Sequence, residues 1–172
     1  LTNGQKKALD YILQGKNVFL TGPSGTGKST VINMFRNTYR HKRIGMTSTT
    51  GVSALLLGGS TIHSYLGIGL GDGTVEQIVK RVSKNKTALH RWKTLEVLII
   101  DEISMLSPIL FDKLEHVARV IRGGKRMLSQ GDGIPFGGIQ IILTGDFLQL
   151  PVVGEDSFCF EAKSWNSCID HV

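Results

Sequence analysis

The stretch LTGPSGTGKST, residues 20–30, spaces its glycines and its lysine as a phosphate-binding loop requires. The P-loop (Walker A) pattern G-x-x-x-x-G-K-[ST] is matched by Gly22, Gly27, Lys28 and Ser29. Residues 17–21 form a short apolar run rich in β-formers, and residues 29–39 have the pattern of a half-buried helix. A strand before the loop and a helix after it are the setting that this motif needs. We therefore expect nucleotide binding here, rather than a glycine-rich turn with a surface lysine.

The chemistry of this loop gives each residue type a role. The glycines allow positive φ angles and let backbone N–H groups surround phosphate oxygens, while the helix N-terminus adds partial positive charge. Lys28 is expected to contact the β- and γ-phosphates and to serve catalysis, and Ser29 is expected to bind Mg²⁺ through its hydroxyl. The nucleotide-binding residues expected from the loop are Gly22, Pro23, Ser24, Gly25, Thr26, Gly27, Lys28, Ser29 and Thr30.

Length and composition limit the number of domains, the partners and the compartment that can be expected. The 172 residues suit one domain, and the start at Leu1 leads us to expect a piece of a longer protein. Twenty Lys and Arg against fourteen Asp and Glu give a net charge of +6, a modest bias toward polyanions. Cys159 and Cys168 lack the spacing of a zinc site or a disulfide framework, so we expect a reducing, intracellular location. We also expect a monomer. No membrane partner is expected, because no apolar run approaches ~20 residues.

The remaining pattern is that of an α/β protein. Apolar runs at residues 17–21, 43–47, 97–100 and 140–144 predict buried strands. Helical periodicity separates them, most clearly over residues 74–83 and 108–122. Continuous apolar strands separated by helices predict a parallel sheet with helices on both faces, a P-loop sandwich. Glycine-rich residues 67–73 and 123–138 are expected to be loops, the second of them flexible.

Two strand ends carry candidate catalytic side chains. The run VLIIDE, residues 97–102, ends in Asp101, expected to hold Mg²⁺, and in Glu102, expected to orient the attacking water. The alternative is a strand end with two solvated acids. In LTGDFLQLPVV, residues 143–153, Gln149 is the candidate sensor of the γ-phosphate. Asp146 is left open between a ligand-facing role and stabilisation of a turn.

Residues 47–69 combine many small hydroxyls with glycines and with His63 and Tyr65. Hydroxyls and close backbone suit phosphate contacts, and the two rings suit base stacking on a single strand. The alternative is a Ser/Thr-rich turn around a packed His-Ser-Tyr. A basic run is interpreted as solvated helix surface rather than a DNA track, and it comprises Lys80, Arg81, Lys84, Lys86, Arg91 and Lys93.

Together these segments resemble the first RecA-like domain of the petite-integration-frequency (PIF) family of superfamily-one DNA helicases. Residues 1–9, LTNGQKKAL, resemble its Q motif, and residues 47–69 are similar to motif Ia and the other motifs that hold single-stranded DNA. DEISML resembles motif II and GDFLQLP motif III, while residues 110–122 resemble the signature helix. Residues 158–165 resemble the end of this domain. The loop at residues 125–135 looks longer than the family's usual link.

The resemblance implies an RecA-like fold over residues 1–172 and a 5′-to-3′ DNA translocase driven by ATP and Mg²⁺. It makes Gln5 the adenine contact, and single-stranded DNA and duplex junctions the partners. A second RecA-like domain, outside this chain, would supply the transition-state arginine, because Arg36 and Arg40 lie away from the phosphates. The implied DNA-binding residues are Thr47, Thr49, Thr50, Gly51, His63, Ser64, Tyr65 and Gly67.

Two other functions stay open. A nucleotide-gated DNA-binding module without turnover would not need Glu102 as a water-orienting acid. A P-loop kinase of a small molecule would need a lid and an acceptor pocket, for which the sequence offers no candidate.

Overall fold

A five-stranded parallel sheet forms the centre of the molecule in the computed structural model, which describes residues 1–123, 133–148 and 157–169. The strand order is β1-β5-β4-β2-β3, and every pair is parallel. The strands are β1 (Val18–Thr21), β2 (Ile44–Ser48), β3 (Ser60–Thr61), β4 (Val97–Asp101) and β5 (Gln140–Gly145). The α/β class expected from the sequence is thereby confirmed.

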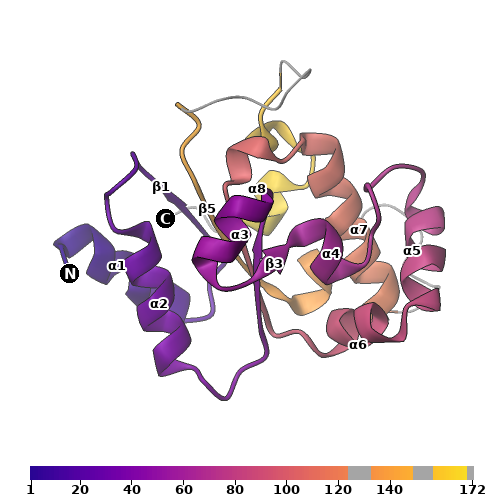
Figure 1. Ribbon diagram of the computed structural model, residues 1–172, viewed down its shortest axis with the longest axis horizontal. Coiled ribbons are helices and arrows are strands. Elements are labelled where there is room, and N and C mark those ends of the chain that lie inside the picture. Colours follow the sequence, from indigo (N-terminus) through magenta and orange to yellow (C-terminus); the bar gives the residue numbers. More distant parts are fainter. Residues whose placement is uncertain (124–132, 149–156, 170–172) are drawn as a thin grey trace.

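Helices cover both faces of this sheet, as Figure 1 shows. On one face lie α1 (Asn3–Leu13) and α2 (Lys28–Thr38). The larger group, mostly on the other face, comprises α3 (Gly51–Leu57), α4 (Ile62–Leu66), α5 (Val75–Lys84), α6 (Lys86–Thr94), α7 (Pro108–Gly123) and α8 (Trp165–Cys168), with the short 3₁₀ turns η1 (Ile103–Met105), η3 (Pro135–Gly138) and η4 (Cys159–Glu161). No helix in the described part of the chain is both long and apolar enough to cross a membrane.

Strand β4 shows why two apolar layers form. Its side chains alternate between the faces, so Val97 and Ile99 join the core beneath α1 and α2. Leu98 and Ile100 join the larger core that contains Trp92 and Phe111. All four of these β4 side chains are fully buried, which is why the strand appears in the sequence as an unbroken apolar run.

The predicted strands match the observed ones within one residue at each end. The two-residue strand β3 was not predicted, because it is too short to show a pattern. Within the expected loop at residues 123–138, α7 extends to Gly123, and Phe136 in η3 is fully buried. The ends of that segment are therefore structured, and residues 124–132 lie outside the described part.

Candidate nucleotide-binding site

The P-loop joins β1 to α2 at the carboxyl edge of the sheet. Gly27 is the N-cap of α2 with a φ of 83°, in the left-handed region that favours glycine. A Cβ at this position would also collide with the Nε2 atom of Gln5. Two demands, a positive φ and a close neighbour, therefore select glycine here.

Lys28 is the first residue of α2, and its ammonium points back over the loop. Its Nζ atom donates to the carbonyl oxygens of Gly22 and, at 3.0 Å, of Pro23. The hydroxyl of Thr26 donates to the same Pro23 oxygen at 2.8 Å. Ser24, Gly25, Ser29 and Thr30 are exposed around this turn. The lysine charge is thus held within the loop, at the position where phosphates would lie.

A cavity of about 310 Å³ joins this loop to the ends of β4 and β5. Its lining residues are Ser24, Gly25, Gly27, Lys28, Ser29, Asp101, Glu102 and Asp146. Because all the strands run parallel, their carboxyl ends meet at one edge and bring together residues more than 100 positions apart. The structure therefore unites the P-loop with both acids of the VLIIDE run.

Asp101, the last residue of β4, is fixed by its neighbouring strand. The hydroxyl of Thr144 on β5 donates to its Oδ1 atom. Thr144 was not among the predicted site residues. It ends the fourth apolar run, but its place beside Asp101 depends on the register of β4 and β5. A carboxylate that accepts this bond keeps its remaining lone pairs for another ligand.

Glu102 follows directly in a strained conformation. Its φ of 56° lies in the left-handed region, which is uncommon for residues other than glycine. Its carbonyl oxygen accepts bonds from the Thr49 hydroxyl at 2.9 Å and from the Met105 amide at 3.0 Å. These two bonds hold the turn that aims the carboxyl group into the cavity.

The electrostatics of Glu102 reflect its acidic surroundings. Burial raises the pKa of its carboxyl group, and the negative charge of Asp101 adds to this effect. Lys28 opposes the rise, while Asp146 contributes a smaller increase. The carboxyl group thus binds protons more readily than a solvated glutamate, as a group that accepts a proton from water does.

Asp146 combines the two roles that the sequence left open. Its Oδ1 atom accepts a bond from the Leu148 amide at 3.0 Å, which is turn stabilisation. It also lines the cavity and is only 8% exposed. Gln149, the candidate γ-phosphate sensor, lies outside the described residues.

The donor set fits a magnesium ion held together with nucleotide phosphates. In residues 1–123, 133–148 and 157–169, no three His, Cys, Asp or Glu side chains are placed to hold a metal by themselves. Mg²⁺ is commonly bound through one or two protein oxygens plus phosphate oxygens. The Ser29 hydroxyl and the Asp101 carboxylate line the same cavity and supply that number.

Gln5 lies on the other side of the P-loop, where a second cavity of about 330 Å³ lies against α1 and β1. Its Nε2 atom donates to the Thr26 carbonyl at 2.8 Å, and its Oε1 atom accepts from the Thr2 amide at 2.9 Å. The second bond completes the capping box that starts α1. An adenine contact would therefore use the remaining N–H of this amide or the second lone pair of its Oε1 atom, or replace one of the two bonds.

Several hydroxyls of the 47–69 segment are already bonded within the fold. Thr47 is fully buried on β2, and its hydroxyl donates to the Ile99 carbonyl at 2.6 Å. Thr49 bonds to Glu102, and Thr50 caps α3 by accepting from the Ser53 amide at 3.2 Å. Thr47 therefore faces the sheet in this structure, not a surface that DNA could reach.

The second half of this segment contains both packed and exposed groups. Tyr65 is half-buried against Gly45, and the Arg91 guanidinium lies 4.6 Å from its ring centroid. Burial raises the pKa of Tyr65 and lowers the pKa of half-buried His63. Gly51 and Ser64 are exposed, whereas Gly67 caps α4 with a φ of 64°.

The basic run between residues 80 and 93 also contains both hydrogen-bonded and solvated side chains. Arg81 donates to the Ile68 carbonyl at 2.7 Å and pairs with Asp72 at 3.5 Å. Arg91 donates to the Tyr65 carbonyl at 3.1 Å. The exposed lysines of the run are Lys80, Lys84, Lys86 and Lys93, and Arg81 is exposed as well. The two arginines therefore brace loops and helices, while the lysines form the solvated surface that was expected.

Comparison with known proteins agrees with this arrangement. The family model described as PIF1-like helicase matches residues 1–171. The ATP-dependent DNA helicase RRM3 of Saccharomyces cerevisiae is 44% identical over 98% of this chain and 24% of its own length. The crystal structure of Pif1 helicase from Candida albicans superimposes with a TM-score of 0.86 at 42% identity, over 98% of this chain and 38% of that one.

A Bacteroides Pif1 structure, described as a complex with ADP-AlF3 and single-stranded DNA, gives a TM-score of 0.73 at 28% identity over 97% of this chain and 40% of that one. The chain spans about a sixth to a third of the length of the curated relatives it matches. The P-loop and the DEISML strand end occur together with this sheet order. The family model matches the chain almost from end to end, and the chain therefore belongs to the PIF1-like helicase family.

Proposed function

We propose that this chain is the ATP-binding RecA-like domain of a DNA helicase that moves 5′ to 3′ along single-stranded DNA. The observation that carries this proposal is the single cavity lined by Lys28, Ser29, Asp101 and Glu102. Such a cavity contains the phosphate, metal and water positions of an NTPase at once. The family membership of the chain supports the link from this cavity to DNA.

In this proposal Lys28 neutralises charge on the β- and γ-phosphates, and the backbone amides of the loop position them. Ser29 and Asp101 would hold Mg²⁺, which supplies charge neutralisation on the phosphates. Glu102 orients the attacking water and accepts its proton. Thr49 acts as a positioning residue, because its hydroxyl holds the Glu102 carbonyl.

The Thr49 contact also connects the two proposed sites. Thr49 belongs to the segment 47–69 that we propose for DNA, and its backbone amide donates to the Asp101 carbonyl at 3.2 Å. A shift of this segment when a DNA strand binds would thus move the backbone at Asp101 and Glu102. The exposed groups that we propose to face DNA are Gly51 and Ser64, with Thr50 and His63 partly exposed. The relative from Bacteroides supports a single strand as the ligand.

Other parts of the machinery are proposed to lie elsewhere. The solved relatives are more than twice the length matched here, which supports a second RecA-like domain that supplies the transition-state arginine. Arg36 and Arg40 do not line either cavity beside the P-loop. A reducing compartment is proposed from Cys159 and Cys168, which are both buried free thiols.

Steady-state ATP hydrolysis by the purified chain with saturating oligothymidine tests this proposal. We expect micromolar-range ATP binding, slow hydrolysis that DNA stimulates, and a further loss of about 10²-fold or more in Glu102→Gln, with ATP affinity nearly unchanged. Wild-type turnover of several per second would contradict the need for a second domain. Hydrolysis that is equal in wild type and Glu102→Gln would instead favour the nucleotide-gated binding module.

A further inference from the structure

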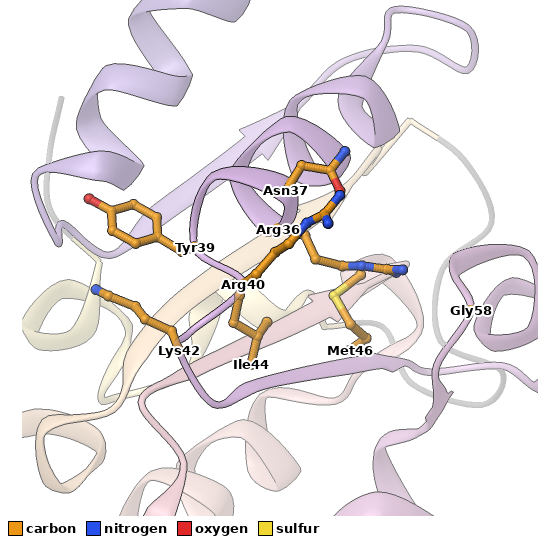
Figure 2. A pocket seen from close by; sticks show the side chains of 8 residues that line it. All are labelled: Arg36, Asn37, Tyr39, Arg40, Lys42, Ile44, Met46 and Gly58. Carbon is orange, nitrogen blue, oxygen red and sulfur yellow. The ribbon is translucent and has the colours of Figure 1, made fainter.

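A third cavity, with mostly polar lining residues, lies away from the nucleotide cleft, at the far end of α2. Its volume is about 440 Å³, and Figure 2 shows the eight residues that line it. They are Arg36, Asn37, Tyr39, Arg40, Lys42, Ile44, Met46 and Gly58. None of them lines either of the cavities beside the P-loop. The sequence pattern had marked Arg36 and Arg40 only as unsuited to the ATP phosphates.

This cavity has an excess of positive charge. Arg36 and Arg40 are exposed, Lys42 is half-buried, and no carboxylate of the described residues belongs to the lining. The ion pairs found among the described residues involve none of these three cations. Lys42 lies over the ring of Tyr39, 4.6 Å from its centroid. Three positive charges without a negative partner at one cavity favour an anionic ligand.

The helix end itself explains only part of this charge. Arg36 lies in the last turn of α2, where a cation compensates the partial negative charge of the final carbonyls. Arg40 and Lys42 lie beyond the end of the helix and exceed that need. The partial charge of about −0.5 at a helix end is also smaller than three full positive charges.

The shape of the donors indicates phosphate. Arginine presents a planar fork of N–H donors that matches two phosphate oxygens. Figure 2 shows the Arg36 and Arg40 side chains and the Asn37 amide on one side of the cavity, with Ile44 and Met46 along β2. The apolar side chains suit the sugar of a nucleotide, whereas the guanidinium and amide groups suit its phosphate.

The position of the cavity connects it with the proposed DNA segment. Gly58 is the C-cap of α3, and the Arg36 Nη1 atom lies 3.8 Å from the place of a Cβ at Gly58. Gly51, at the opposite end of α3, belongs to the proposed DNA contacts. Seven helical residues span about 10 Å. A single strand of a few nucleotides is long enough to span that distance.

We propose that this α2-end pocket binds adjacent backbone phosphates of the single DNA strand that also contacts residues 47–69. The inference rests on the proposed DNA-binding function and extends it by a second contact. The strand would run along α3, with Gly51 at one end and the guanidinium groups of Arg36 and Arg40 at the other. Contacts to phosphate oxygens give affinity without reading sequence.

The test compares two charge-matched double variants of the purified chain, Arg36→Gln/Arg40→Gln and Lys80→Gln/Lys84→Gln. Both remove two exposed positive charges, but Lys80 and Lys84 lie on α5, away from the pocket. Fluorescence anisotropy with oligothymidine is measured over a salt series, and thermal melts verify that each variant is folded. For two lost phosphate contacts we expect the slope of log K against log salt to shrink by about 1.4 in the arginine variant. Its affinity should fall by about tenfold at low salt, while the lysine variant keeps the wild-type slope.

The possible outcomes separate this proposal from the function on which it rests. A wild type that binds oligothymidine with a slope that the arginine variant shares would overturn the pocket and leave the DNA-binding function intact. Equal losses in both double variants would mean general charge attraction, which also overturns the pocket. A wild type that binds ATP but no oligothymidine would overturn the DNA-binding function itself. Unchanged DNA affinity together with lost binding of a polyglutamate peptide would assign the pocket to an acidic protein segment instead.

Discussion

The P-loop and the 47–69 segment were both predicted to bind phosphates, but the structure uses their residues differently. In the P-loop the expected donors are backbone amides and one lysine, and several of its residues stay exposed around a cavity. In the 47–69 segment the expected donors are side-chain hydroxyls, and those of Thr47 and Thr49 are bonded to the backbone carbonyls of Ile99 and Glu102. A glycine-rich backbone motif identifies its ligand more directly than a set of hydroxyls, because hydroxyls also cap helices and bind carbonyls.

In the 47–69 segment, the largest loss of folding stability is expected from a substitution of Tyr65. Its ring lies against Gly45 and beneath Arg91, so we expect Tyr65→Ala to lower the free energy of unfolding by about 2 kcal/mol. Urea denaturation measures this loss, and Tyr65→Phe serves as the control because it keeps the packed ring. A stable Tyr65→Ala chain that loses 1–3 kcal/mol of oligothymidine affinity would instead assign the ring to base stacking.

A smaller effect is expected for Thr47, where the difference between the two regions is clearest. Thr47→Val removes the buried hydroxyl that donates to Ile99, which should cost about 1 kcal/mol of unfolding free energy. Oligothymidine affinity should not change, because the side chain does not reach the surface. The matched variant Thr47→Ser keeps the hydroxyl and should recover most of the stability. Lost DNA affinity in a stable Thr47→Val chain would restore the sequence-based assignment.

The smallest expected effect on folding stability comes from the titration of Glu102. Because its pKa in the folded chain is raised above the ordinary value of 4.5, the folded state binds more protons than the unfolded state above that pH. Its contribution to stability therefore decreases as the pH rises from 4.5 through the folded pKa. Glu102→Gln should melt at a higher temperature than wild type at pH 7, and the difference should shrink as the pH approaches 4.5.

Glu76 provides the control of opposite sign for this experiment. It is fully exposed, and its own backbone amide and the Thr74 hydroxyl lower its pKa by hydrogen bonding. Its contribution is present above the ordinary glutamate pKa and is lost as the pH falls. Glu76→Gln should therefore not raise the melting temperature at pH 7. A melting temperature of Glu102→Gln equal to wild type across this range would contradict the raised pKa.

The predictability of each region follows from its physical basis. The strands were predictable because burial on both faces gives unbroken apolar runs, as in β4. The cavity at the sheet edge was predictable because parallel strands gather their carboxyl ends. The bond from Thr144 to Asp101 depends on the register of two neighbouring strands, which the sequence does not state. Thr47 and Thr49 were indistinguishable as letters, since their difference arises because Thr47 is buried within β2 whereas Thr49 follows the end of that strand.

The α2-end pocket could not be predicted from spacing either. Arg36 and Arg40 are separated by about one helical turn, but their proximity to Gly58 follows from how α3 returns beside β2. The two-residue strand β3 fixes that return by pairing Ser60 and Thr61 with Thr47 and Ser48. The two-residue strand β3 thus helps to position the α2-end pocket, whose lining residues are distant in sequence.

Equilibrium binding of ATP with Mg²⁺ to wild type, Lys28→Ala and the exposed control Lys80→Ala tests the nucleotide site most directly. If the cavity between the P-loop and the Asp101–Glu102 strand end holds the nucleotide phosphates, Lys28 contacts them. A lost charge-assisted contact of about 1.5–3 kcal/mol corresponds to an affinity reduced about 10- to 100-fold in Lys28→Ala. Lys80→Ala should bind as wild type does. A Lys28→Ala chain that is folded and binds ATP within twofold of wild type would show that the nucleotide lies elsewhere.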